Sequence, residues 1–283
     1  MKKTMLLLFS TMFCTILFFV GCVHTSKSIQ IASSSQVLKK KFYSRSLAQN
    51  MNFNIYLPNG YNKKNKYPVL YLIHGYSDNE DKWMPNLQLN EQADLLIENE
   101  RIVPLIIVMP QIDNSFGINT DKVMNQSDAF TAGLYEDYLY KDLIPYIDKN
   151  YSTIKNKDGR FIGGLSMGGW AALHLAFIHT DMFSKVGGHS PAFIDASWLY
   201  PTFDIRTRRD PIKLASEKDL TSLKVYLDCG DKDSFKFYEG CNQLYTILQS
   251  NGVTSEYHLN DGEHNDTYWK KNSEKYLLFY AGK

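Results

Sequence analysis

The stretch GGLSMGG at residues 163–169 decides the fold, and it contains the pattern G-x-S-x-G at residues 164–168. The apolar pair Phe161-Ile162 precedes it, and the Ala-rich segment 167–180 follows it. A serine at the tip of a sharp strand-to-helix turn needs small neighbours, because the strained backbone packs tightly there. We therefore predict a strand–turn–helix elbow with Ser166 at its tip. The alternative is a Gly-rich turn that only caps a helix.

Working outward, apolar segments alternate with helical ones. Continuous apolar runs at 68–73 and 102–108 suit parallel strands buried on both faces, whereas the alternating pattern of 51–57 suits a half-exposed strand. Further strands are expected at 161–162, 185–186, 223–227 and 255–259, and helices at 135–147, 167–180, 236–251 and 267–281. Pro145 should kink or end the first of these helices. The alternation predicts an α/β fold, with a mostly parallel central sheet covered by helices on both faces.

The N-terminus predicts export. Lys2 and Lys3 precede a 16-residue apolar run, Met5 to Val20, which is shorter than the ~20 residues that a spanning helix needs. Gly21-Cys22 at the end of this run resembles a bacterial lipoprotein signal, so Cys22 is the expected lipidation site; plain secretion and an uncleaved anchor are the alternatives. We expect a signal peptide at 1–21, a Ser-rich tether at 22–36 and a single folded domain at 37–283.

Composition excludes several classes of protein. The 283 residues are 44% apolar with a net charge of +1, which provides a large core and no basic surface for nucleic acid. No His or Cys pair has zinc-ligand spacing, and the acidic run at 78–81 lacks the glycine of an EF-hand loop, so we expect no metal and no cofactor. Cys229 and Cys241 are expected to be buried and reduced.

A serine hydroxyl needs a base and an orienting carboxylate to act as a nucleophile. In α/β folds with this elbow, the acid and then the histidine follow the serine along the chain. His264, in the polar turn after the last expected strand, is the candidate base. Asp233 is the favoured acid; Asp231 is the second choice, and Asp228 lies at the end of a strand and could form a turn.

Two backbone N–H groups are candidates for an oxyanion hole. One belongs to Met167, directly after the serine, and the other to Tyr76, in the loop after the strand at 68–73. Gly75 would let the backbone turn so that the N–H of Tyr76 points inward. His74 precedes the serine in the chain, and we interpret it as structural.

Four segments carry a family resemblance: residues 67–75, 143–148, 163–169, and Gly262-Glu263-His264 with Trp269 downstream. Together they resemble the esterase-D-like "putative esterase" family, which includes feruloyl, acetylxylan and enterochelin esterases, S-formylglutathione hydrolases and mycolyltransferases. The resemblance spans roughly residues 38–280. It implies the α/β-hydrolase fold, with Ser166 as nucleophile, Asp233 as acid, His264 as base, and Tyr76 and Met167 at the oxyanion positions.

The expected function is serine carboxyl-ester hydrolysis at the cell envelope. Feruloyl or acetyl esters of plant-cell-wall polysaccharide are the leading substrate class, and Trp170, Phe193 and Trp269 are candidate substrate-binding residues. A general short-chain carboxylesterase, a siderophore esterase and an acyltransferase remain alternatives. A catalytically silent carbohydrate-binding lipoprotein is the alternative from another class. An exported location disfavours S-formylglutathione as the substrate.

Overall fold

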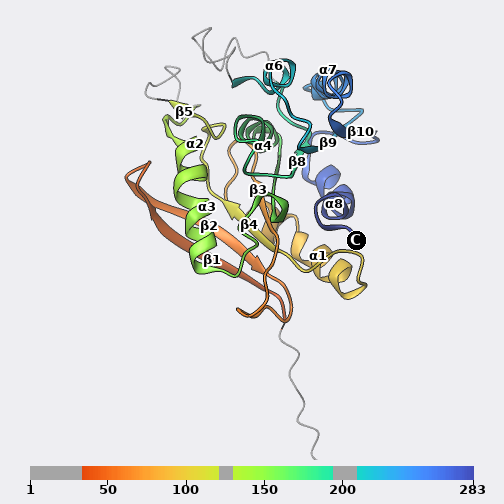
Figure 1. Cartoon of the computed structure of the whole chain (residues 1–283). Coiled ribbons are helices and arrows are strands. Elements are labelled where there is room, and N and C mark those ends of the chain that lie inside the picture. Colours follow the sequence, from red (N-terminus) through yellow and green to blue (C-terminus); the bar gives the residue numbers. More distant parts are fainter. Residues whose placement is uncertain (1–33, 121–129, 194–208) are drawn as a thin grey trace, which may run out of the picture. The chain divides into compact units, whose positions relative to one another are not determined.

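A mixed sheet forms the centre of the fold (Figure 1). The computed structural model describes residues 34–120, 130–193 and 209–283. Within these residues, the sheet has eight strands in the order β1-β2-β4-β3-β7-β8-β9-β10. The strands in that order are Gln36–Ser44, Gln49–Leu57, Ile106–Pro110, Val69–Ile73, Arg160–Leu165, Lys185–His189, Lys224–Gly230 and Thr254–Asn260. The pairs β1–β2 and β2–β4 are antiparallel, and every other neighbouring pair in this sheet is parallel.

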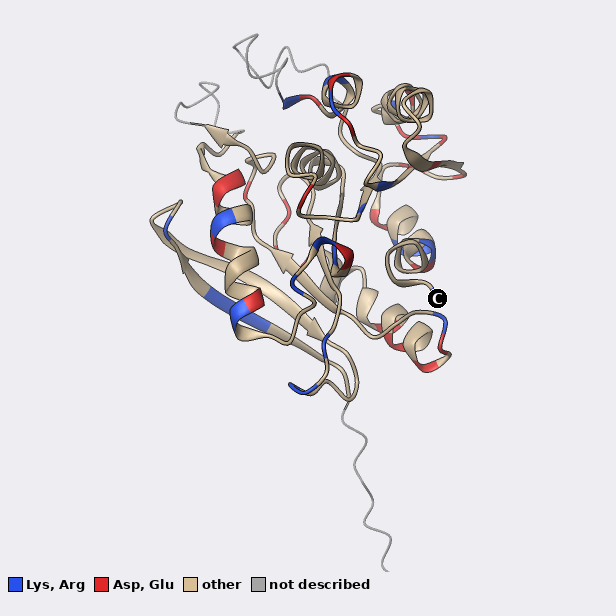
Figure 2. Cartoon of the chain, viewed as in Figure 1, with Lys and Arg blue, Asp and Glu red and all other residues tan. Residues whose placement is uncertain are grey.

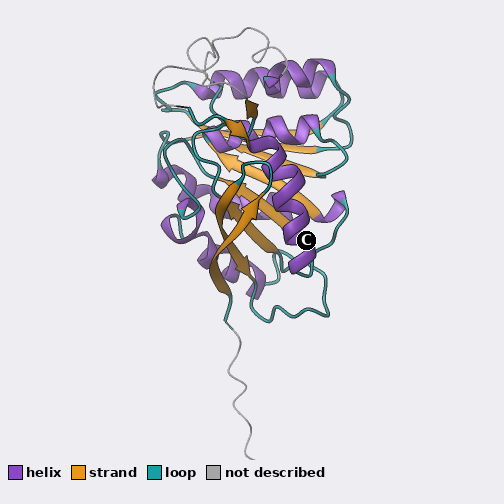
Figure 3. Cartoon of the chain, turned by 90° about the vertical axis from the view of Figure 1, so that its left-hand side faces the viewer, coloured by secondary structure: helices purple, strands orange, loops and turns teal. Residues whose placement is uncertain are grey.

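Helices cover both faces of this sheet (Figure 3). One face carries α2 (Tyr135–Asp137), the π-helix η2 (Tyr138–Leu143), α3 (Ile144–Asn150), α4 (Met167–Ile178), α6 (Pro211–Glu217) and α7 (Phe237–Ser250). The other carries η1 (Lys82–Asn86), α1 (Leu89–Glu98) and α8 (Asp266–Ala281). The short elements η3 (Lys157–Gly159), β5 (Asn119–Thr120) and β6 (Gly133–Leu134) lie outside these layers.

The sequence of β3 is a continuous apolar run because its side chains alternate between two apolar cores. Val69, Tyr71 and Ile73 belong to the apolar core on one face, whereas Leu70 and Leu72 belong to the core on the other. Successive side chains of a strand point to opposite faces, so a strand covered on both sides needs apolar residues throughout. The predicted mostly parallel α/β architecture is confirmed.

Individual elements differ from the sequence prediction in informative ways. The strand expected at 102–108 begins only at Ile106, because Ile102 instead forms a bridge to Gly282 near the C-terminus. Pro145 does not end the helix expected at 135–147. The backbone stays helical from η2 into α3, and the helix is widened in η2, directly before the turn that contains Pro145. The strand β1 and the helices α1 and α6 were not predicted.

The edge strand β1 carries Lys39, Lys40 and Lys41, all exposed. Figure 2 shows this basic stretch on the outer strand, with charges of both signs spread over the helices elsewhere. Lysines on an edge strand hinder pairing with a second sheet.

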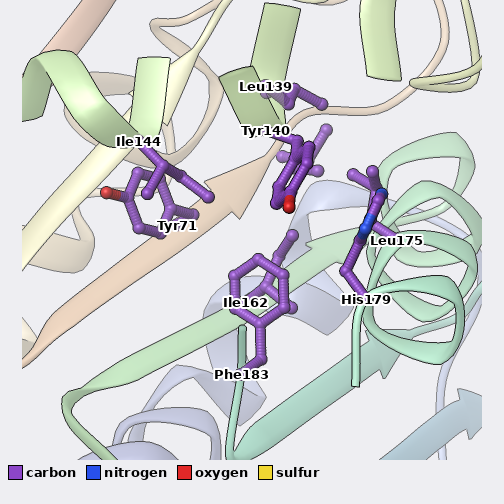
Figure 4. A pocket seen from close by; sticks show the side chains of 9 residues that line it. Tyr71, Leu139, Tyr140, Ile144, Ile162, Leu175, His179 and Phe183 are labelled. Atoms are coloured by element: carbon purple, nitrogen blue, oxygen red, sulfur yellow. The ribbon is translucent and has the colours of Figure 1, made fainter. Parts of the chain in front are cut away.

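One small cavity of ≈ 10 Å³ lies on the α4 face of the sheet, within the core. Its mostly apolar lining consists of Tyr71, Ile73, Leu139, Tyr140, Ile144, Ile162, Leu175, His179 and Phe183. Figure 4 shows this lining from close by. This is a packing gap of about one water molecule rather than a substrate site.

No helix among residues 34–120, 130–193 and 209–283 has the length and apolarity needed to cross a bilayer. The expected signal peptide, the lipidation site Cys22 and most of the expected tether lie outside the described residues.

Candidate active site

Ser166 lies at the tip of a strained turn between β7 and α4. Its backbone has φ +52° and ψ −119°, a conformation that non-glycine residues rarely adopt. A Cβ on Gly164 would lie 2.4 Å from the backbone of Gly168, and one on Gly168 would lie 2.4 Å from carbonyl oxygens at the end of β3. The two glycines therefore allow the close backbone contact that the sequence predicts for the elbow.

A second pair of glycines has a different role. Gly163 and Gly187 are partners in the β7–β8 ladder, and a Cβ on them would lie 1.8 Å and 2.0 Å from the hydroxyl oxygen of Tyr280. Tyr280 is fully buried near the end of α8. Gly163 thus makes room for a helix side chain, which the elbow pattern alone does not reveal.

The three groups predicted to act together form one hydrogen-bonded chain. His264, in the loop between β10 and α8, has its Nε2 2.9 Å from Ser166 Oγ and its Nδ1 2.8 Å from Asp233 Oδ2. Asp233 follows β9, and its side chain is fully buried. In the arrangement that satisfies all three groups, Nδ1–H donates to the carboxylate and Nε2 accepts from the hydroxyl.

Hydrogen bonds keep the Asp233 carboxylate ionised. Burial opposes ionisation, but bonds from His264, from Cys229 Sγ (3.3 Å) and from the backbone N–H of Phe235 (2.8 Å) outweigh it. Together they hold the pKa of Asp233 below its usual value. A charged carboxylate is the form that orients an imidazole and stabilises its protonated state.

The two competing acids have other partners. Asp231 is exposed, and its Oδ1 accepts a bond from the backbone N–H of Gly262 at 3.1 Å, in the loop that carries His264. Asp228 is fully buried and accepts bonds from the hydroxyls of Tyr268 and Tyr276 and from a ring nitrogen of His189, at 2.6, 2.9 and 2.9 Å. Of the three aspartates considered, Asp233 is the one hydrogen-bonded to His264.

The loop after β3 passes close to the serine. A Cβ on Gly75 would lie 2.9 Å from Leu165 Cδ1 and 3.6 Å from Ser166 Cβ, so the close approach rather than a turn explains the glycine. Met167, whose N–H is the other oxyanion candidate, is the first residue of α4.

His74 fixes the direction of the peptide between Gly75 and Tyr76. Its Nδ1 lies 2.7 Å from the carbonyl oxygen of Gly75, and its Nε2 accepts from the backbone N–H of Ile112 at 3.0 Å. Burial lowers the pKa of His74, which favours the neutral ring that these two bonds require. Because the peptide is planar, fixing the Gly75 carbonyl also fixes the N–H of Tyr76. The geometry agrees with a structural role for His74.

Three aromatic rings contact the imidazole of His264. Phe235, Phe237 and Trp269 approach it nearly edge to face, with centroid distances of 5.3, 5.1 and 5.0 Å. Only Trp269 was predicted as a site residue. The two phenylalanines follow Asp233 by two and four positions, so their closeness to the candidate acid was an available signal.

The other two candidate substrate-binding residues pack differently. Trp170 is buried, and its ring lies against Phe116 and His174, with centroid distances of 5.7 and 5.3 Å. Phe193 is half-buried and packs on α7, where a Cβ on Gly240 would lie 2.5 Å from its side chain. The structure therefore brings Trp269 to the imidazole. Trp170 lies against Phe116 and His174, and Phe193 lies against α7, so substrate binding by these two rings stays a prediction.

Lys82 ties two loops of the site together. Its ammonium lies 3.2 Å from Asp78, in the loop after β3, and 2.7 Å from Asp266, at the start of α8. The same group lies 5.6 Å from the centroid of Trp269. The loop that carries Tyr76 is thereby held to the helix that follows His264.

The described residues include no group of three or more His, Cys, Asp or Glu arranged to hold a metal ion. Cys229 and Cys241 are free and buried.

Comparison with known proteins identifies the family. The Esterase family model, described as "Putative esterase", matches residues 44–275. The chain belongs to this esterase family. The predicted family resemblance and the implied α/β-hydrolase fold are confirmed, and the family is one of carboxylic ester hydrolases.

Relatives of this esterase-family chain carry related names. It is 31% identical over 241 residues to an endo-1,4-beta-xylanase/feruloyl esterase of Xylanibacter ruminicola, covering 83% of this chain but 30% of that protein. It is 24% identical over 267 residues to an acetyl esterase of Caldicellulosiruptor saccharolyticus, covering 83% and 94% of the two chains. The solved structure of a ferulic acid esterase matches with a TM-score of 0.75 and 28% identity, over 87% of this chain and 97% of that one.

Proposed function

We propose that this chain hydrolyses carboxylic esters through a catalytic triad of Ser166, His264 and Asp233. One observation carries the proposal: a serine on a strained elbow is hydrogen-bonded to an imidazole, and that imidazole to a buried carboxylate, at 2.9 and 2.8 Å. These are the distances at which a base can take the serine proton as the oxygen attacks.

In the acylation step, Ser166 Oγ attacks the ester carbonyl while His264 Nε2 takes its proton. The carbonyl oxygen becomes an oxyanion, which the backbone N–H groups of Tyr76 and Met167 stabilise; each such donor contributes about 10²–10³-fold in rate. His264 then gives its proton to the departing alcohol oxygen. The products of this half-reaction are a free alcohol and an acylated Ser166.

In the deacylation step, water replaces the alcohol. His264 takes a proton from the attacking water, the tetrahedral intermediate collapses, and the proton returns to Ser166 Oγ. Asp233 stays ionised throughout and stabilises the imidazolium. The carboxylic acid is released, and Ser166 regains its free hydroxyl.

We further propose that the substrates are feruloyl or acetyl esters of plant-cell-wall polysaccharide. The names of the two relatives and of the solved ferulic acid esterase support this class. The chain would act at the cell envelope, held outside the cytoplasmic membrane by a lipid on Cys22, or secreted. General short-chain carboxylesterase and siderophore esterase activities are the competing substrate ranges.

The test compares hydrolysis of methyl ferulate, 4-nitrophenyl acetate and 4-nitrophenyl octanoate. We expect Ser166→Ala to lower turnover of every ester cleaved by about 10⁴-fold or more, with its thermal unfolding unchanged. Ser234→Ala, at an exposed serine beside Asp233, is the matched control and should keep full activity. Activity retained by Ser166→Ala, or a wild-type chain inert toward all esters including acetylated xylan, would refute the proposal.

A further inference from the structure

Phe235 is an exposed aromatic ring that packs beside the proposed base. Its relative exposure is 65%, although it is a large apolar residue. The ring stacks on the buried Phe237, with 5.3 Å between centroids and 13° between planes. Its backbone N–H donates to Asp233 Oδ1 at 2.8 Å, so the same loop fixes the acid and the ring.

The position of this ring indicates which half of a substrate it meets. His264 Nε2 gives its proton to the departing oxygen, so the alcohol half of the ester lies beside the imidazole, whereas the acyl half lies at Ser166 and the oxyanion donors. Phe235 is 5.3 Å from the His264 ring. Phe237 and Trp269 also contact this ring but are 5% exposed each, which leaves Phe235 as the accessible one of the three.

The two loops that carry Asp233 and His264 also carry exposed charged groups. Lys232 and Asp261 form an exposed ion pair at 2.6 Å on the two loops that carry Asp233 and His264, and Glu263 is exposed directly before His264. An alkyl chain is best held in an enclosed apolar groove, which this setting is not. A sugar ring, by contrast, has one face of C–H groups that packs on an aromatic face, and hydroxyls around its edge that bond to charged groups.

We propose that Phe235 forms a subsite for the sugar ring that carries the esterified hydroxyl. This inference rests on the proposed function and assigns a residue to the carbohydrate half of the proposed ester, whichever acyl group that ester bears. Phe235 would then select sugar esters over esters of small alcohols, through stacking rather than through the chemistry of the triad.

The test uses two acyl groups on two kinds of alcohol. Methyl ferulate and methyl acetate are compared with a feruloylated methyl arabinofuranoside and an acetylated methyl xyloside, and kcat/KM is measured for each. The readout is kcat/KM for the sugar ester divided by kcat/KM for the methyl ester of the same acyl group. A loss of activity that is common to all four esters cancels in this ratio. For Phe235→Ala we expect this ratio to fall by about 3–10-fold for both acyl groups.

Further variants separate stacking from folding. Phe235→Leu keeps apolar bulk on Phe237 but removes the aromatic face, and should also lower the ratio; Phe235→Tyr should preserve it. Tyr43→Ala, at an exposed aromatic residue on the edge strand β1 with 59% exposure, should change neither ratio nor activity.

The following results would overturn the inference. Equal loss on all four esters would mean that Phe235 only supports His264. A loss that follows the feruloyl group, whatever the alcohol, would place the ring on the acyl side. If the wild-type chain cleaves 4-nitrophenyl esters but none of these four, the inference fails and ester hydrolysis stands. If it cleaves no ester at all, the proposed function itself fails, independently of Phe235.

Discussion

At the scale of single residues, one carboxylate among three is expected to carry the function. Asp233 bonds to the imidazole, while Asp231 bonds to a backbone N–H in the loop that carries His264. An amide in place of the Asp233 carboxylate would favour the wrong tautomer of His264, with its proton directed toward the serine. An amide in place of Asp231 still offers an oxygen to Gly262.

Asp233→Asn should therefore lower kcat on the order of 10⁴-fold, whereas Asp231→Asn should stay within about tenfold of the wild type. The measurement is kcat for one ester that the wild-type chain cleaves, with thermal unfolding recorded for both variants. The assignment of the acid fails if Asp231→Asn is the more damaged enzyme.

Ser166, His264 and Asp233 can be predicted from the sequence because each lies in or beside a short, recognisable motif. Ser166 sits between glycines that tight packing requires, and His264 and Asp233 follow the ends of identifiable strands. The aromatic setting was harder to predict. The sequence does not distinguish Trp170 from Trp269, whereas the structure shows that the first ring stacks on His174 and the second contacts His264.

At the scale of elements, apolar runs predict buried strands but not their limits. Residues 102–105 are as apolar as β4, yet they lie outside the sheet because Ile102 pairs with the C-terminal segment. The edge strand β1 was not predicted, because its three consecutive lysines interrupt the polar–apolar alternation that a half-buried strand normally shows.

A buried ionic cluster links three of these elements. Glu136 on α2 bonds to His179 (3.1 Å) and lies 3.7 Å from His174, both on or next to α4, and it also pairs with Arg209, just before α6. Burial opposes ionisation of Glu136, but the two histidines and Arg209 outweigh it and hold its pKa well below the usual value. The folded state thus stabilises the charged carboxylate.

Glu136→Gln should lower the free energy of unfolding by about 3 kcal/mol near neutral pH. Because the folded-state pKa is lowered, this stabilisation is complete above the ordinary glutamate value of 4.5 and shrinks as the pH falls below it. Denaturant unfolding of both proteins across this range measures the difference.

The matched control for this prediction is Glu217→Gln. Glu217 lies 3.5 Å from Lys213 on α6, and both side chains are exposed, so its loss should change stability by less than about 1 kcal/mol. The role of the cluster would be contradicted if Glu136→Gln changed the free energy of unfolding as little as Glu217→Gln. It would also be contradicted if the destabilisation by Glu136→Gln grew as the pH falls below 4.5.

At the scale of the whole molecule, the parallel sheet assembles the site. The loops after β3, β7, β9 and β10 supply Tyr76, Ser166, Asp233 and His264, and all four strands end at one edge of the sheet. The order of these residues along the chain is therefore predictable from the fold. The contacts of α7 and α8 with the site are not, since they depend on how whole helices pack against it.

The central claim is that Ser166 is an activated nucleophile, and covalent labelling tests it most directly. The purified chain is treated with a fluorophosphonate, which reacts with serines activated by a neighbouring base, and its intact mass and labelled peptide are determined. We predict one adduct per chain, located on Ser166, absent from Ser166→Ala and formed far more slowly in His264→Ala. An adduct on another residue, or equal labelling of Ser166→Ala, would contradict the account.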